Sequence, residues 1–289
     1  MTLKEEKLFC CVCKKLNVYE TVTDFSPSVQ HDLDGRPHGE ERYALTKSIQ
    51  VCPYCRYANF SVDTEIEGFD AEKVVHSGEF LERAKKVSGA KKFILSAYLY
   101  EKARDFITAG YLYMNAAWTF DDENAKNSRT TSKLHEKSQG SNEETKNSHI
   151  SARTFDDKID RERLKSIEVT NENQNLNEKH SQSVHSKDFK GENDEDCAKY
   201  FRIKAAECFA KGGFSEDTAA AHCDCLRRTG DFKAARTFAK KALKILRPEG
   251  ELYDSLKIEI DLCRKKDDSC KVFVPRKKGF FGFFRGKKK

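Results

Sequence analysis

The fold is decided by two stretches: residues 216–247, EDTAAAHCDCLRRTGDFKAARTFAKKALKILR, and residues 90–120, AKKFILSAYLYEKARDFITAGYLYMNAAWTF. Both place large and small apolar residues three and four positions apart and contain no proline, which predicts amphipathic helices. Shifted by 126 positions, Asp105-Phe106 falls on Asp231-Phe232. The small residues correspond as well, with Ala97 on Cys223, Ala109 on Ala235 and Ala116 on Ala242. We interpret the match as an internal repeat of a helix–turn–helix unit.

The repeat resembles the tetratricopeptide motif, most clearly in the run Gly230-Asp-Phe-Lys-Ala-Ala. In that motif a Gly-Asp-aromatic step forms the turn between two antiparallel helices, and small residues let the helices approach closely. The first copy departs from the motif, because Arg104 stands where the turn glycine is expected. Further helices are predicted over Cys197–Lys211 and about Glu251–Arg264, since roughly three helical pairs are needed to bury their own faces. The alternative is an ordinary helical hairpin whose match is coincidental.

Cysteine spacing predicts a metal site near the N-terminus. Cys10-Cys-Val-Cys13 and Cys52-Pro-Tyr-Cys55 are two C-x-x-C pairs separated by 38 residues. Two intervening residues allow both thiolates of a pair to reach one ion, and two pairs complete a tetrahedral S₄ site. The spacer is expected to form a β-hairpin, with strands at Asn17–Thr23 and Tyr43–Val51. The predicted ligands are Cys10, Cys13, Cys52 and Cys55, and Cys11 is expected to point away.

Zinc is the expected metal, in a structural role. Four-cysteine sites of zinc and iron look alike in sequence, so iron is an alternative. A redox C-x-x-C motif needs only one pair, at the start of a helix, and neither pair here opens a clear helix. Four unrelated buried thiols are the remaining alternative. The residue after the second cysteine of each pair is often a glycine that tolerates a positive φ angle, but here it is Lys14 or Arg56.

The second cysteine pair also carries a family resemblance. The run Val51–Ala58, together with the paired C-x-x-C motifs and the helices ending Ala116-Ala117-Trp118, resembles an uncharacterised bacterial family, domain of unknown function 2225. The resemblance covers about residues 8–121 and 197–265. It implies a zinc-ribbon-like head on tetratricopeptide-like helices, and it implies no reaction.

Composition indicates how the rest of the chain is organised. Only 38% of the residues are hydrophobic and 35% are charged, so part of the chain is not core. Residues 122–195, rich in Asn, Ser, Lys and Glu, are predicted to be disordered because they cannot bury enough apolar surface to offset ordering. We predict a multidomain chain: a small β zinc-ribbon-like head, then an all-α tetratricopeptide-like repeat array with a disordered insert. The predicted parts are the head at 1–68, helices at 69–121, the insert at 122–195, further helices at 196–268 and a tail at 269–289.

The net charge of +6 is a property of the C-terminal end. Residues 276–289 hold seven of the 53 basic residues and no acidic one, which leaves 46 basic and 47 acidic residues elsewhere. Basic residues interleaved with phenylalanines suit an anionic membrane surface. The residues predicted to contact such a surface are Arg276, Lys277, Lys278, Phe280, Phe281, Phe283, Phe284 and Arg285.

The cellular location is predicted to be the cytoplasm, with a peripheral membrane contact through the tail. The first ten residues contain no apolar signal segment. No stretch approaches the ~18 apolar residues that span a bilayer. Eleven cysteines in such a chain imply a reducing compartment, where cysteines bind metal or fill cores.

The function is predicted to be non-catalytic binding of a protein or peptide partner in the concave groove of the helices. The residues predicted to line that groove are Lys91, Ile94, Tyr98, Glu101 and Lys102, then Asp217, Ala220, Asp224, Arg227 and Arg228. One alternative is a nucleic-acid-associated zinc ribbon. Residues 1–60 hold eight basic and eight acidic side chains, so they lack the basic footprint that phosphates require. The other is a metal- or thiol-dependent enzyme using the loop His31–His38, whose Asp-Gly and Arg-Pro steps are more typical of a solvated turn.

Overall fold

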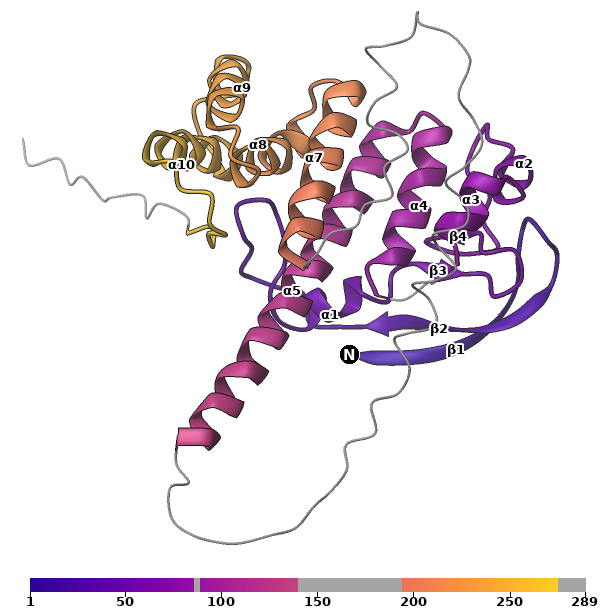
Figure 1. Ribbon diagram of the computed structural model, residues 1–289. Coiled ribbons are helices and arrows are strands. Elements are labelled where there is room, and N and C mark those ends of the chain that lie inside the picture. The colour runs from indigo at the N-terminus through magenta and orange to yellow at the C-terminus, as the bar shows by residue number, and fades with distance from the viewer. Residues whose placement is uncertain (86–88, 140–193, 275–289) are drawn as a thin grey trace, which may run out of the picture. The chain divides into compact units, whose positions relative to one another are not determined.

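The computed structural model describes residues 1–85, 89–139 and 194–274 (Figure 1). The chain forms two compact units, one made of Met1–Asn127 with Gly191–Lys289 and the other of Ser128–Lys190. Of the second unit only the end of one helix is described, so the fold below is that of the first unit. The predicted insert lies largely outside the described residues, and the eight tail residues predicted to contact a membrane lie entirely outside them.

The N-terminal region consists of two antiparallel hairpins. β1 (Thr2–Phe9) pairs with β2 (Leu16–Asp24), and β3 (Gln50–Val51) pairs with β4 (Ala58–Asn59). β2 contains the first predicted strand. Its partner β1 has no strand signal of its own, because Leu, Lys and Glu are good helix formers. Pairing with the valines and threonines of β2 overrides that local preference.

The segment between the two hairpins differs from the prediction. The sequence predicts a strand at Tyr43–Val51, but Tyr43 lies in helix α1 (Gly39–Leu45) and only the two residues of β3 are extended. Glu40 and Glu41 occupy the first turn of α1, where negative charge stabilises a helix N-terminus. The predicted hairpin across the spacer therefore does not form, and each hairpin surrounds one C-x-x-C pair instead.

Helices make up most of the remaining described chain (Figure 1). The elements are α2 (Ala71–Val75), α3 (Gly78–Arg83), α4 (Lys91–Lys102), α5 (Phe106–Gln139), α7 (Asp194–Gly212), α8 (Glu216–Arg228), α9 (Phe232–Ile245) and α10 (Glu251–Lys265). α7 and α10 contain the two additional helices predicted from the sequence. α7 packs on α8, and α8, α9 and α10 pack on one another. A small antiparallel-strand region followed by a mostly helical chain confirms the coarse fold prediction.

α5 is longer than predicted. The insert is predicted to begin at residue 122, yet α5 continues to Gln139. No proline or glycine occurs from Asp121 to Gln139, and extending an existing helix costs far less than starting one. Despite its length α5 is not apolar, and no helix in the described part of the chain is both long and apolar enough to cross a membrane.

The α4–α5 and α8–α9 hairpins match each other at the turn. Arg104 and Gly230 both have positive φ angles, 64° and 88°. Asp105 and Asp231 each accept a hydrogen bond from the N–H three residues later, at 3.0 Å in both. The paired small residues are all buried, namely Ala97, Ala109 and Ala116 in the first hairpin and Cys223, Ala235 and Ala242 in the second. The structure thus shows two matching hairpins, and it does not by itself assign them to the tetratricopeptide motif.

Helices α5 and α7 meet at a glycine. A Cβ atom at Gly110 would lie 2.6 Å from Cε1 of Phe209, a fully buried side chain of α7. Along the same interface the ring of Phe201 stacks on Tyr113 and Phe120, with centroids 6.0 and 5.8 Å apart. Because the helices approach so closely here, glycine fits at position 110, and any residue with a Cβ atom would collide with Phe209.

The hydrophobic core passes from the strands into the helices without a break. One cluster of buried residues includes Cys10, Cys52 and Tyr57 from the hairpins and extends through α4 and α5 to Phe209 of α7. A second cluster joins α8, α9 and α10 around Leu256. The boundary predicted at residue 68 therefore does not coincide with a gap in the core, and the head and the first helices share buried surface.

Candidate metal centre

Each C-x-x-C pair lies in the turn of its own hairpin. Cys10–Cys13 connects β1 to β2, and Cys52–Cys55 connects β3 to β4. In each turn the residue after the second cysteine donates its N–H to the carbonyl of the first cysteine, at 2.9 Å for Lys14 and 3.0 Å for Arg56. These two residues have φ angles of 57° and 67°, as the glycine preference at this position predicts. The two turns are therefore built alike.

The two turns bring all four predicted ligand thiols together. Their sulfur atoms lie within 4.8 Å of one another. Cys10 Sγ is 3.6 Å from Cys55 Sγ, and Cys13 Sγ is 3.5 Å from Cys52 Sγ, so each close pair joins the two hairpins. These separations exclude disulfides, in which sulfurs are about 2.0 Å apart. Four sulfurs at about 2.3 Å from a tetrahedral metal are separated by about 3.8 Å, so the cluster fits such an ion.

Burial governs the acidity of these thiols. It raises the pKa of Cys10 to about 11 and the pKa of Cys55 well above its ordinary value. Burial also acts on Cys52, but backbone N–H groups of Cys55 and Tyr54 point at its sulfur and outweigh burial, so its pKa is lowered. A cation among the sulfurs would reverse the penalty on the buried thiolates, since metal binding is coupled to loss of the thiol protons.

Cys11 is turned away from the cluster, as predicted. Its N–H donates to the Val62 carbonyl at 2.8 Å, and its sulfur lies 3.5 Å from the Thr64 carbonyl oxygen. The same Thr64 carbonyl accepts from the hydroxyl of Tyr57 at 2.8 Å. Cys11 therefore helps to position the segment after β4, and it supplies no ligand.

The family comparison agrees with the site. Residues 3–227 match the family model described as an uncharacterized protein conserved in bacteria (DUF2225). The chain belongs to this family. The match includes all four thiols and ends at Arg227 in α8, so it stops short of residue 265, where the sequence resemblance was expected to end. No curated protein and no solved structure matches the chain.

The loop His31–His38 of this DUF2225 member is buried, which corrects the expectation of a solvated turn. Asp34 is 4% exposed and Arg36 is 3% exposed. The indole N–H of Trp118 donates to Asp34 Oδ2 at 2.6 Å, and Arg36 donates to the Trp118 carbonyl at 2.7 Å. Gly35, with a φ of 84°, makes the tight turn that aims both charged residues at α5. Charged turn residues give no sequence signal of burial, because their partners are about 80 residues away.

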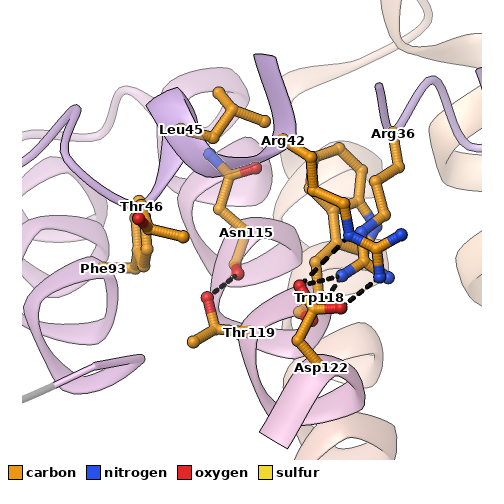
Figure 2. A pocket seen from close by; sticks show the side chains of 9 residues that line it. All are labelled: Arg36, Arg42, Leu45, Thr46, Phe93, Asn115, Trp118, Thr119 and Asp122. Carbon is orange, nitrogen blue, oxygen red and sulfur yellow. Dashed lines mark hydrogen bonds and ion pairs between the residues drawn. The ribbon is translucent and has the colours of Figure 1, made fainter. Parts of the chain in front are cut away.

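Figure 2 shows the small cleft where this loop meets α1 and α5. Arg36 and Arg42 converge on Asp122, with Arg36 Nη2 2.6 Å from Asp122 Oδ2. The other lining residues are Leu45, Thr46, Phe93, Asn115, Trp118 and Thr119. The space is large enough for about one water molecule. Its charged groups are paired within the protein, so the cleft is a junction between head and helices.

The ionic junction extends to helices α7 and α8. Asp121 pairs with Arg202 of α7 and, at 3.1 Å, with Arg228 of α8. Burial favours a raised pKa for Asp121, but the two guanidinium groups outweigh it and the pKa is lowered. For Asp34, nearby positive charge does not outweigh burial. Burial, and then the nearby charge of Asp224, raise the pKa of Asp34 to about 6. Sequence reasoning missed Asp121 and Arg202, which belong to no short motif, and it placed Asp34 and Arg228 in a loop and a groove without indicating that they meet.

The residues predicted to line the groove differ in exposure, and three of them, Tyr98, Asp224 and Arg227, are buried. Tyr98 is buried under α3, with its ring centroid 6.1 Å from that of Phe80. Arg227 is fully buried, and Asp224 beside it is buried as well. Among the other predicted groove residues, three are exposed, namely Lys91, Lys102 and Asp217. The rest are partly buried, namely Ile94, Glu101, Ala220 and Arg228.

Proposed function

We propose that this protein is a non-catalytic adaptor whose head is built around a structural zinc ion and whose helices bind a protein partner. The observation that carries the proposal is the set of four thiols, two from each hairpin, within 4.8 Å of one another. Four protein ligands complete a tetrahedral site and leave no position for a substrate or water, which is typical of structural zinc. Zinc is favoured over iron because structural zinc is the commoner use of such a ligand set.

The adaptor role is supported by the way the head joins the helices. The hydroxyl of Tyr100 in α4 donates to Asn59 Oδ1 in β4 at 2.8 Å, and Asn59 in turn donates to the Tyr57 hydroxyl at 3.0 Å. A metal that orders the β3–β4 hairpin would therefore also order α4, at the start of the helical region. The matching hairpins favour a tetratricopeptide-like array, whose extended surfaces bind partners.

The polar groups of the His31–His38 loop support the same proposal. Asp34 and Arg36 are used to hold Trp118 and Asp122, and Asp32 lies 2.7 Å from the ring Nε2 of His38. Acid–base chemistry needs groups that reach a substrate. Here the loop's buried carboxylates face the protein's own side chains, which favours a scaffold role for the loop.

Metal content tests the zinc head. Purified wild-type protein is expected to contain about one zinc per chain, because structural zinc binding contributes roughly 10–16 kcal/mol to folding. The double variant Cys52→Ser/Cys55→Ser should lose the metal. Cys11→Ser is the matched control, since Cys11 lies in the same turn and outside the cluster, and it should keep the metal. Stoichiometric iron with visible absorbance, or a folded metal-free head, would contradict the proposal.

Partner capture tests the helical surface. Lys91 and Lys102 are the exposed basic members of the predicted groove. Reversing both charges (Lys91→Glu/Lys102→Glu) should abolish cross-linking of the partner that the wild-type chain captures. Lys240→Glu, an exposed charge reversal on α9, is the control and should capture as the wild type does. Unchanged capture by the double variant would show that this surface is not used.

A further inference from the structure

The chain turns back after α10 and lies along α8 and the His31–His38 loop. We call residues Asp267–Phe273 the return segment. Arg227 Nη1 donates to the carbonyls of Asp267 and Ser269, both at 2.8 Å. The N–H of Leu33 donates to the Lys271 carbonyl at 2.8 Å, and the N–H of Phe273 donates to the His31 carbonyl at 2.8 Å. The bonded positions are thus 267, 269, 271 and 273.

The bonds at Lys271 and Phe273 are the pattern of an extended strand, whereas the carbonyls of Asp267 and Ser269 converge on one nitrogen of Arg227 at a bend. Successive carbonyls of a strand point in opposite directions, so alternate residues present their main-chain groups to one side. Asp32 and Val272 form an antiparallel bridge within this arrangement. Recognition through main-chain groups depends little on sequence, as in strand addition to a sheet edge. Leu33 and His31 therefore form a short edge that pairs with an extended segment, and Arg227 holds the bend that precedes it; we call these three residues the track.

Phe273 is the one large apolar side chain of the return segment that is not exposed, and it is only partly buried. Val272 is 39% exposed and Val274 is 67% exposed, and Asp268 and Ser269 are exposed as well. The side-chain contact of the return segment with the loop is Cys270 Sγ at 3.3 Å from Asp32 Oδ2. Segments with exposed main-chain bonds and little buried apolar surface open locally at lower free energy than the core. The return segment is thus suited to reversible release.

The track itself would persist after release. Arg227 is fixed from below by Asp224 of α8 and by Glu259 of α10, whose Oε2 is 2.8 Å from Nε. Leu33 is buried. The family match covers His31, Leu33 and Arg227 and ends before the return segment. The hydrogen-bonding groups of the track therefore belong to the family-matched part of the chain, and the segment that occupies them does not.

We infer that this track is a binding site for an extended peptide of a partner and that the return segment occupies it in the isolated chain. The inference rests on the proposed adaptor function and adds its regulation, because partner and return segment compete for the same groups. A fitting partner segment is extended and carries a hydroxyl or thiol donor at the position of Cys270, where it meets the buried carboxylate of Asp32.

The test uses the full chain and a labelled peptide with the sequence of residues 266–274, with serine at the position of Cys270. Phe273→Pro removes the N–H that bonds to His31 and should loosen the return segment. The peptide should then bind about tenfold more tightly than it binds the wild type, because a tethered segment competes at high effective concentration. Val274→Pro is the matched control, since in the described structure its N–H has no hydrogen-bond acceptor, and it should bind the peptide as the wild type does.

Hydrogen exchange on the wild-type chain gives a readout that does not depend on a variant folding. The amides of Leu33 and Phe273 should exchange faster than those in the middle of α8. Exchange as slow as in α8 would show that the segment is a permanent part of the fold and would overturn the inference. Equal peptide binding by wild type and Phe273→Pro, with exchange showing the segment released, would overturn it too. Zinc analysis of the same samples separates this result from failure of the proposed zinc head.

Discussion

Replacing Gly110 with alanine tests whether α5 and α7 pack as closely as the structure shows. The new Cβ would lie 2.6 and 2.7 Å from two ring atoms of Phe209, where ordinary contacts exceed 3.4 Å. The ring cannot yield easily, because it is fully buried and its centroid is 5.2 Å from that of Tyr111 and 6.0 Å from that of His222. Either the ring or the helix must therefore move.

The magnitude follows from two opposing effects. Overpacking a core costs about 1–3 kcal/mol. Alanine is a better helix former than glycine by about 1 kcal/mol, which offsets part of that cost. We therefore expect Gly110→Ala to reduce the free energy of unfolding by up to about 2 kcal/mol, and to be about 1–3 kcal/mol less stable than an alanine variant that gains helix propensity without overpacking.

Urea unfolding followed by circular dichroism measures the change as a shift in midpoint. Gly78→Ala is the matched control, because Gly78 also lies in a helix and a Cβ there would meet nothing within 4 Å. That variant should be unchanged or slightly more stable. If Gly110→Ala is as stable as Gly78→Ala, the close α5–α7 approach is refuted.

Two further predictions concern buried polar groups. Trp118→Phe removes the indole N–H that donates to Asp34 at 2.6 Å, and it should lower the free energy of unfolding by about 1–3 kcal/mol in denaturant titration; an unchanged value would mean that the bond contributes nothing. Burial between Phe209 and Phe238 lowers the pKa of His222 to about 4. Between about pH 4 and 6.5, His222 is therefore protonated in the unfolded chain and neutral in the folded chain. Wild-type stability should therefore fall relative to His222→Phe as pH is lowered through that window, and parallel pH profiles for the two proteins would contradict the lowered pKa.

The metal ligands and the helical turns could be predicted because their signals are local. Two residues between cysteines suffice to bring a pair of thiolates to one ion, whatever the surrounding fold. The Asp-aromatic step at Asp105 and Asp231 caps the following helix in both hairpins, so a comparison of the two stretches was enough to find it. The same locality explains the positive φ angles at Lys14 and Arg56.

The features that sequence reasoning missed depend on distant partners. β1 is a strand because β2 lies beside it. Asp34 and Arg36 can be buried because Asp34 accepts a hydrogen bond from Trp118 and Arg36 pairs with Asp122. The loop sequence alone does not indicate these contacts. Arg227 falls at a groove position of the repeat, but α10 and the return segment cover it. In each case the tertiary contact, rather than local composition, decides the outcome.

X-ray absorption at the zinc edge of the purified wild-type protein tests the central claim most directly, because it reports the atoms bound to the metal. The four thiols whose sulfurs lie within 4.8 Å of one another should give a single shell of sulfur neighbours. We predict four sulfurs at about 2.3 Å and no nitrogen or oxygen ligand. A mixed shell containing nitrogen or oxygen, or protein that folds and purifies without zinc, would contradict a structural four-cysteine zinc head.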